Sequence, residues 1–281
     1  MISLPPSELF PDFSTFRFKR ALSEIPKDSI EVNISADAED LLDLRRFAQI
    51  RTLRVAGGIS QKLFLQLCRL ESIVNLHLDH LRVTDLSPLR AMSELQWLSI
   101  RSGTKVASLE VLASMKNLSG LAIENFKKVS DVSPLGGLVQ LKELGIEGSI
   151  WTAMRIKTLD PLKKLIGLRR LHMTNLRVED GSLAPLEFLT HLAILQCGNL
   201  YAMEEFARLA GILTSCRCEW FDPSREPYDA LGPCSRCGGT RIMLTGRGIR
   251  LMCSRCDTAK ITDHVRRFGD IRDAAHRNRG S

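Results

Sequence analysis

Several features are scarce or missing in this chain of 281 residues. Aromatic residues make up only 6% of it, so aliphatic side chains must build most of any core. No apolar run approaches the ~18 residues of a membrane span. The start, Met1 to Pro6, has neither the basic nor the apolar region of a signal peptide. We therefore expect a cytoplasmic protein whose eight cysteines are core residues or metal ligands rather than disulfides.

Known catalytic motifs are absent as well. The chain has no G-x-x-x-x-G-K-[ST], no H-E-x-x-H and no G-x-S-x-G. The short Gly246-Arg247-Gly248 run is too brief for a dinucleotide loop. We therefore expect a protein that is not an enzyme and that has no evident small-molecule substrate.

Charge is unevenly distributed along the chain. The net charge is +7, and the stretch from Cys234 to the end, with eleven basic and four acidic residues, accounts for all of it. Such asymmetry indicates either an anionic partner for the tail or a solvated, charged C-terminus.

Leucine provides the strongest pattern. The motif L-x-x-L-x-L, with occasional Ile, Val, Met or Cys, begins at Ile50, Ile73, Leu95, Leu118, Leu141, Leu168 and Leu192. A second motif, V-x-D-x-x-P-L, follows at a fixed offset in Val83–Leu89 and Val129–Leu135. One such repeat cannot bury its own leucines, so neighbouring repeats must stack into a continuous core.

On these motifs the chain resembles leucine-rich repeat proteins of the short, ~22-residue class, to which bacterial internalins and phosphatase-regulator proteins belong. The resemblance covers about residues 28–220. It implies an α/β solenoid, an arc with parallel strands on its concave face. It implies little about function, because this scaffold serves many partners. The class usually has Asn just after the strand. Here Leu81, Phe126 and Leu176 stand there, so we expect an irregular spiral.

The expected domains are an N-terminal cap over residues 1–48, about eight repeat turns over 49–221, and a metal-binding tail over 222–281. The tail contains Cys234-x2-Cys237 and Cys253-x2-Cys256, separated by fifteen residues. This spacing is typical of a structural zinc site, and residues 232–260 resemble a zinc ribbon with a small β-hairpin. Four Cys leave no open position for catalysis. A short basic helix should follow, with Val265, Phe268 and Ile271 on its apolar side.

The strand register predicts which residues face the concave side. Among them Trp97, with Arg101 beside it, is the strongest candidate contact for a protein partner, because Trp and Arg dominate binding hot spots. The other candidates are His77, Asp79, Glu124, Glu143, Glu147, Arg170 and His172. The alternative is that the aromatic-rich N-terminal segment folds back over Trp97. The fifth turn is four residues longer, around Trp151, which either contacts a partner or tucks under its loop.

The sequence therefore favours a protein-binding module that serves as an adaptor, an inhibitor or an immunity-type protein. The alternative is a nucleic-acid-associated adaptor whose Arg-rich ribbon contacts phosphate. Its candidate contacts are Arg241, Arg247, Arg250, Arg266 and Arg267. No membrane contact is expected, and the sequence does not choose a partner or an oligomeric state.

Overall fold

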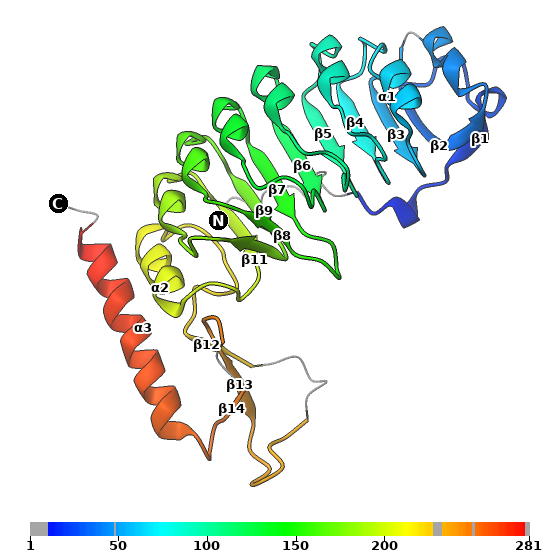
Figure 1. The fold of residues 1–281 in the computed structure, drawn as a ribbon. Helices are drawn as coiled ribbons and strands as arrows, with labels where there is room; N and C mark the ends of the chain where they lie inside the picture. The colour runs from blue at the N-terminus through cyan, green and yellow to red at the C-terminus, as the bar shows by residue number, and fades with distance from the viewer. Residues whose placement is uncertain (1–10, 48, 227–231, 249–250, 279–281) are drawn as a thin grey trace.

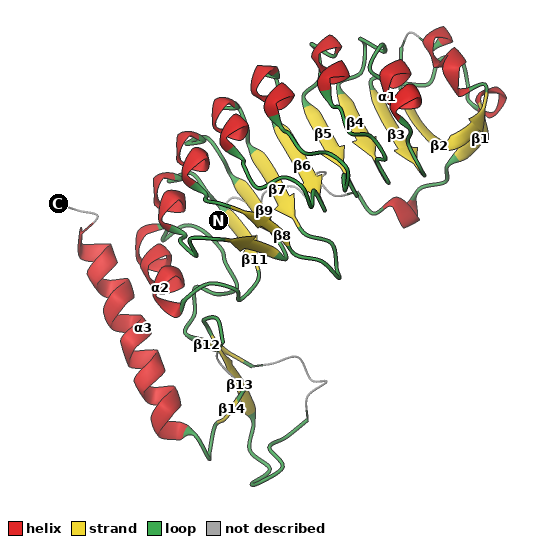
Figure 2. Ribbon diagram, viewed as in Figure 1, coloured by secondary structure: helices red, strands yellow, loops and turns green. Residues whose placement is uncertain are grey.

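The chain winds as a curved solenoid with one strand per turn (Figure 1). The structure is a computed structural model that describes residues 11–47, 49–226, 232–248 and 251–278. Nine parallel strands form the main sheet in chain order: β1 (Lys19–Ala21), β2 (Glu31–Glu39), β3 (Thr52–Ala56), β4 (Asn75–Leu78), β5 (Trp97–Ile100), β6 (Gly120–Glu124), β7 (Glu143–Glu147), β9 (Arg170–Met173) and β11 (Ile194–Cys197). Strands occupy one side of each turn and short helices the other (Figure 2).

A single column of leucines runs through the main sheet. Strand pairing sets Leu53 opposite Leu76, Leu76 opposite Leu98, and so on through Leu121, Leu144 and Leu171 to Leu195. Every member is buried. Side chains alternate between the two faces of a strand, so the residues between the leucines point to the concave face. The predicted parallel-strand solenoid is confirmed.

The chain turns sharply after most strands. His80, Ser102, Asn125 and Asn175 all have left-handed backbone conformations there, with φ between 50° and 61°. Asn tolerates this region better than most residues. In two turns the expected Asn therefore lies one position before the Phe126 and Leu176 that the sequence placed there. In the longer turns a second, two-stranded parallel sheet follows, made of β8 (Met154–Ile156) and β10 (Leu176–Val178).

The outer side of the arc carries short helices. Two are α-helices: α1 (Gln61–Leu67) and α2 (Met203–Ile212). The others are 3-10 helices: η2 (Leu22–Glu24), η3 (Leu41–Arg46), η4 (Ser87–Ala91), η5 (Glu110–Ser114), η6 (Ser133–Gly137), η7 (Asp160–Lys164) and η8 (Ala184–Phe188). One further 3-10 helix, η1 (Phe13–Thr15) in the N-terminal segment, lies instead on the strand side. Asp85 and Asp131 of the second motif accept hydrogen bonds from the backbone N–H of Ser87 and Ser133. The Asp therefore fixes the start of each short helix.

The tail packs against the last turns of the arc. Its antiparallel sheet comprises β12 (Ser224–Arg225), β13 (Arg241–Leu244) and β14 (Met252–Cys253). The final helix, α3 (Thr258–Asn278), is longer than the short helix expected and starts four residues earlier than Thr262. It lies along α2, with Phe268 completely buried (Figure 1). None of the described helices is both long enough and apolar enough to cross a membrane.

The contact between α2 and α3 is close enough to test. A Cβ atom on Gly211 would clash with the backbone carbonyl of Arg272, which cannot move aside independently of α3. We expect Gly211→Ala to lower the free energy of unfolding by roughly 1–3 kcal/mol, as overpacking does. The measurement is urea denaturation with proteolysis of α3.

Gly269→Ala is the control, because a Cβ there meets no atom within 4 Å. That variant should gain up to about 1 kcal/mol, since Ala favours helix. Equal effects of both changes would contradict the packing.

Candidate functional site

The four cysteines of the tail come together. Their sulfur atoms all lie within 4.8 Å of one another. The Sγ of Cys237 is 3.3 Å from the Sγ of Cys253 and 3.3 Å from that of Cys256. A tetrahedral zinc with Zn–S bonds of about 2.3 Å needs sulfurs about 3.8 Å apart. The cluster can therefore hold a metal ion, and its all-thiol donor set suits zinc.

Each Cys-x-x-Cys turn directs backbone N–H groups at its own sulfur atoms. Gly239 donates to the Sγ of Cys237, and both Arg255 and Cys256 donate to the Sγ of Cys253. Gly238 has a φ of +66°, which lets the first turn close. Asp257 accepts a hydrogen bond of 2.9 Å from the N–H of Cys253 and so closes the second turn.

These N–H groups favour thiolate. The backbone N–H of Arg236 lowers the pKa of Cys234 to about 6, against the opposing effect of burial. The N–H groups of Cys256 and Arg255 lower the pKa of Cys253. The hydrogen bond with Cys237 raises the pKa of Cys256 to about 12, because neighbouring thiols share protons. A bound cation resolves this competition, since it favours all four thiolates.

The ribbon is attached to the arc through its hairpin tip. The side chain of Asn199 donates to the carbonyl of Leu244 at 3.1 Å and accepts from the N–H of Gly246 at 2.6 Å. The N–H of Arg247 donates to the carbonyl of Tyr201 at 2.7 Å. Asn199 belongs to the turn after β11, so the tail is held by the last turn of the solenoid.

The candidate phosphate contacts of the tail differ in their surroundings. Arg266 pairs with Asp263 and Asp270, and Arg267 pairs with Glu204 of α2 at 3.0 Å. Arg241 is half-buried in β13, whereas Arg247 is exposed at the hairpin tip. Arg250 lies outside the described residues.

The second candidate site is the concave face. Trp97 is half-buried, and its ring lies over Gly120, the residue opposite it on the next strand. A Cβ on Gly120 would clash with that ring. Trp97 therefore lies flat along the sheet instead of projecting from it. The Nε of Arg101 donates to Glu124 at 2.8 Å and is 4.0 Å from Asp79.

The N-terminal segment crosses this face. The Arg101 guanidinium is 5.6 Å from the ring centre of Phe13, and that of Arg54 is 4.6 Å from the ring centre of Phe16. Both distances are typical of cation–π contacts. Phe13 also stacks on Phe18. The segment before β1 therefore passes over Arg101, which follows β5, and over Arg54 of β3. This path resembles the alternative in which the N-terminal segment folds back over the concave face.

A row of buried polar side chains lies at the N-terminal end of the concave face. Strand register sets Arg54 beside His77 and His77 beside Ser99. His77 is only 2% exposed, and its Nδ1 has no hydrogen-bond partner among the described residues. The same holds for Oγ of Ser99 and Nε of Arg54. Burial, with the nearby Arg54 charge, lowers the pKa of His77 to about 4.

The C-terminal half of the face is charged. Glu143 and Arg170 sit opposite each other on β7 and β9 and form an ion pair, with the Arg170 side chain 5% exposed. His172 is half-buried beside them, and burial lowers its pKa. Burial also raises the pKa of Glu147, which accepts a hydrogen bond from the N–H of Thr174.

A hollow of about 540 Å³ opens between these two halves. Arg101, Glu124 and Glu147 line it from the strands, and Asp12 lines it from the N-terminal segment. Sequence reasoning found the strand residues because repeat register specifies them. It offered the fold-back of the N-terminal segment only as an alternative over Trp97, and it did not pair Phe13 with Arg101 or Phe16 with Arg54, because no periodicity links the segment to the strands that it crosses.

Known structures share this geometry. An internalin from Listeria monocytogenes superposes with a TM-score of 0.55 and 23% identity over 66% of this chain. The fold is a leucine-rich repeat solenoid. Internalin C2 from the same organism gives a TM-score of 0.43 and 19% identity, covering 55% of this chain and 66% of its own. This chain spans 52% of the first internalin structure. No family model and no curated protein matches the sequence.

Removing the metal should unfold the ribbon and spare the repeats. The ribbon sheet has only short strands, and structural zinc contributes on the order of 10–16 kcal/mol in finger peptides. We expect about one zinc per chain by mass spectrometry of the metal. After chelation, hydrogen exchange should rise in residues 232–248 and stay unchanged in β5 to β9. Unchanged exchange in the ribbon after complete zinc loss would contradict a structural role.

His77 should make stability depend on pH. Its folded pKa of about 4 lies below the ordinary value of 6.5, so the unfolded chain binds the proton first. The stabilising contribution is present above pH 6.5 and is lost as pH falls to 4, by about 3 kcal/mol in all. We expect His77→Gln to remove most of that dependence in urea titrations between pH 7 and 4. The exposed His191, changed to Gln, is the control and should leave the pH profile unchanged.

Proposed function

We propose that this protein is a non-enzymatic binding module whose concave face holds an extended segment of a protein partner. The observation that carries the proposal is the path of the chain's own N-terminal segment. Phe13 and Phe16 rest on Arg101 and Arg54, so an extended polypeptide with aromatic side chains fits this face.

The polar row beneath that segment supports the proposal. Burying a polar group without a hydrogen bond costs about 1–3 kcal/mol. His77 and Ser99 are buried and have unmatched polar atoms among the described residues. A partner segment that supplied hydrogen bonds to them would bind more favourably than aromatic rings do. The N-terminal segment therefore acts as a cover that a better-matched partner displaces.

The charges of the face suggest the chemistry of the partner. Glu124 and Glu147 border the hollow, and Arg101 stands between them and the N-terminal segment. A surface of both signs suits a peptide carrying both signs better than a polyanion. An adaptor, an inhibitor and an immunity-type protein would all use such a contact.

The tail has a structural part in this proposal. Zinc in the four-cysteine cluster would fix the ribbon, and the ribbon covers the last turn of the arc through Asn199. Solenoids need such end caps because the last repeat has no neighbour. We also propose a cytoplasmic location, because the four thiols must stay reduced to bind a metal.

The test is selection of peptides from a random 12-residue library on the full-length, zinc-loaded chain. Binding of the selected peptides is then measured by calorimetry. Arg101→Glu should lower the affinity for these peptides at least tenfold, because it reverses the charge between Glu124 and the N-terminal segment. Phe13→Ala with Phe16→Ala should raise the affinity for these peptides, because the N-terminal segment then competes less well for the concave face.

The control is Lys164→Glu, an equal charge reversal on η7 at the outer side of the arc. It should leave peptide affinity unchanged. The proposal is contradicted if the peptides bind the Arg101→Glu variant as tightly as the unmodified protein. It is also contradicted if they lose affinity for the control variant.

A further inference from the structure

One edge of the solenoid carries an exposed basic residue in almost every turn. It is the edge at which the strands of the main sheet end. The exposed residues, each next to buried apolar neighbours, are Arg82, Lys105, Lys127, Lys128, Arg155 and Arg177. We call this set the basic edge. Successive turns are about 4.8 Å apart, so the cations of these five turns form a row about 19 Å long.

The best-defined part of the basic edge is at its C-terminal end. Arg155 of β8 and Arg177 of β10 sit directly opposite each other in the two-stranded sheet, and both are exposed. Like charges in that relation are destabilising. Among the residues that the structure describes, neither has a carboxylate within ion-pair distance, so nothing in that part of the chain offsets their repulsion.

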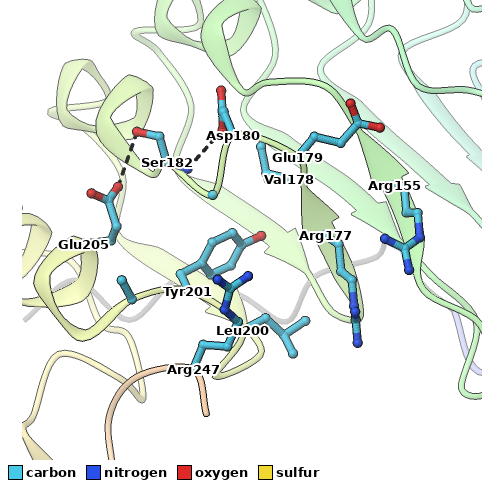
Figure 3. A pocket seen from close by; sticks show the side chains of 12 residues that line it. Arg155, Arg177, Val178, Glu179, Asp180, Ser182, Leu200, Tyr201, Glu205 and Arg247 are labelled. Carbon is cyan, nitrogen blue, oxygen red and sulfur yellow. Dashed lines mark hydrogen bonds between the residues drawn. The ribbon is translucent and has the colours of Figure 1, made fainter. Parts of the chain in front are cut away.

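The ribbon adds one more cation, Arg247, to this row of basic residues. Arg247 is bound through its N–H to the carbonyl of Tyr201, in the turn that follows β11. Figure 3 shows Arg155, Arg177 and Arg247 around one hollow of about 600 Å³, with the ring of Tyr201 beside Arg247. Arg247 also has no ion-pair partner in the described part of the chain. The hairpin tip thus places a basic side chain, Arg247, beside the last turn of the arc.

The acidic residues of this hollow are mostly engaged elsewhere. Asp180 accepts a hydrogen bond of 3.0 Å from the N–H of Ser182, in the turn before η8. Glu205 accepts hydrogen bonds from Ser182 and from the N–H of Leu183, and it pairs with Arg208. Figure 3 shows the Asp180 side chain directed away from Arg155 and Arg177. Of the carboxylates that line the hollow in the described residues, only Glu179 is exposed without such a contact.

A highly exposed aromatic side chain lies close to Arg155 in the chain. Trp151 is 92% exposed and Ile150 is 88% exposed, in the loop that leads into β8 and Arg155. Trp is highly buried on average in folded proteins, and its flat ring suits stacking. This turn is four residues longer than its neighbours, and Trp151 lies four residues before Arg155 in the chain.

We propose that the basic edge binds single-stranded nucleic acid, with Arg155, Arg177 and Arg247 on phosphates and a base stacked on Trp151. A positively charged track with an adjacent aromatic platform is the usual chemistry of such binding. A linear polyanion can contact cations that lie in one row. An anionic membrane would favour cations that are spread over a flat surface. Arg155, Arg177 and Arg247 are not among the residues that line the hollow of the concave face, whereas the loop before Trp151 borders that hollow through Ser149 and Ile150. Variants of the arginines therefore test this proposal separately from the proposed function.

The test is fluorescence anisotropy of labelled 20-nucleotide oligo-uridine and oligo-deoxythymidine, titrated with the full-length, zinc-loaded chain at two salt concentrations. We expect salt-dependent binding, because phosphate contacts release counterions. Arg155→Glu with Arg177→Glu should weaken binding at least 30-fold and flatten the salt dependence. Trp151→Ala should weaken it about tenfold and remove the quenching of protein fluorescence that stacking causes.

The matched control is Lys163→Glu with Lys164→Glu on η7, in the same turn but on the outer side. It makes the same change in net charge and should leave binding within twofold. Circular dichroism checks that each variant is folded, and Arg155→Gln with Arg177→Gln gives a milder loss of charge. The proposal is overturned if the control weakens binding as much as the edge variant. It is also overturned if duplex DNA, polyglutamate or anionic vesicles bind while the single strands do not.

Discussion

The structure depends on the burial of leucines that no single turn can bury. Each leucine of the central column lies beside the leucines of the turns before and after it, and the column is unbroken from Leu53 to Leu195. Replacing such a residue by Ala typically costs about 2–5 kcal/mol. This dependence on neighbours explains why both ends of the arc are covered, by β1 and β2 at one end and by α2, α3 and the ribbon at the other.

The same stacking creates the two candidate surfaces. Because strands are in register, residues at one position of the repeat become a row on the molecule. On the concave face one row is polar and buried, from Arg54 through His77 to Ser99. At the edge where the strands end, another row is basic and exposed, and Arg155 and Arg177 are its clearest members. A repeat protein thus converts a sequence period into a linear surface, and the chemistry of each surface follows from which residue occupies that position.

The metal cluster connects the tail to this arrangement. The ribbon has only short strands, and a metal ion held by its four cysteines would stabilise it in place of a larger core. Its hairpin tip in turn hydrogen-bonds to Asn199 and Tyr201, which holds Arg247 beside the last turn. The final helix makes a separate attachment through Phe268 and the close approach at Gly211. The tail is therefore joined to the arc at two points rather than tethered by a linker.

The sequence alone determined the solenoid, the register of its strands and the four-cysteine cluster, because each follows from spacing along the chain. The same register also sets Glu143 beside Arg170, since both residues hold one position of the repeat. The tertiary structure decided what lies on top of those rows. The contacts of Phe13 with Arg101, of Asn199 with Gly246 and of α3 with α2 join segments far apart in the chain, with no shared period. Such contacts depend on shape and on the direction that the chain takes after each end of the repeat, and only folding in three dimensions fixes these.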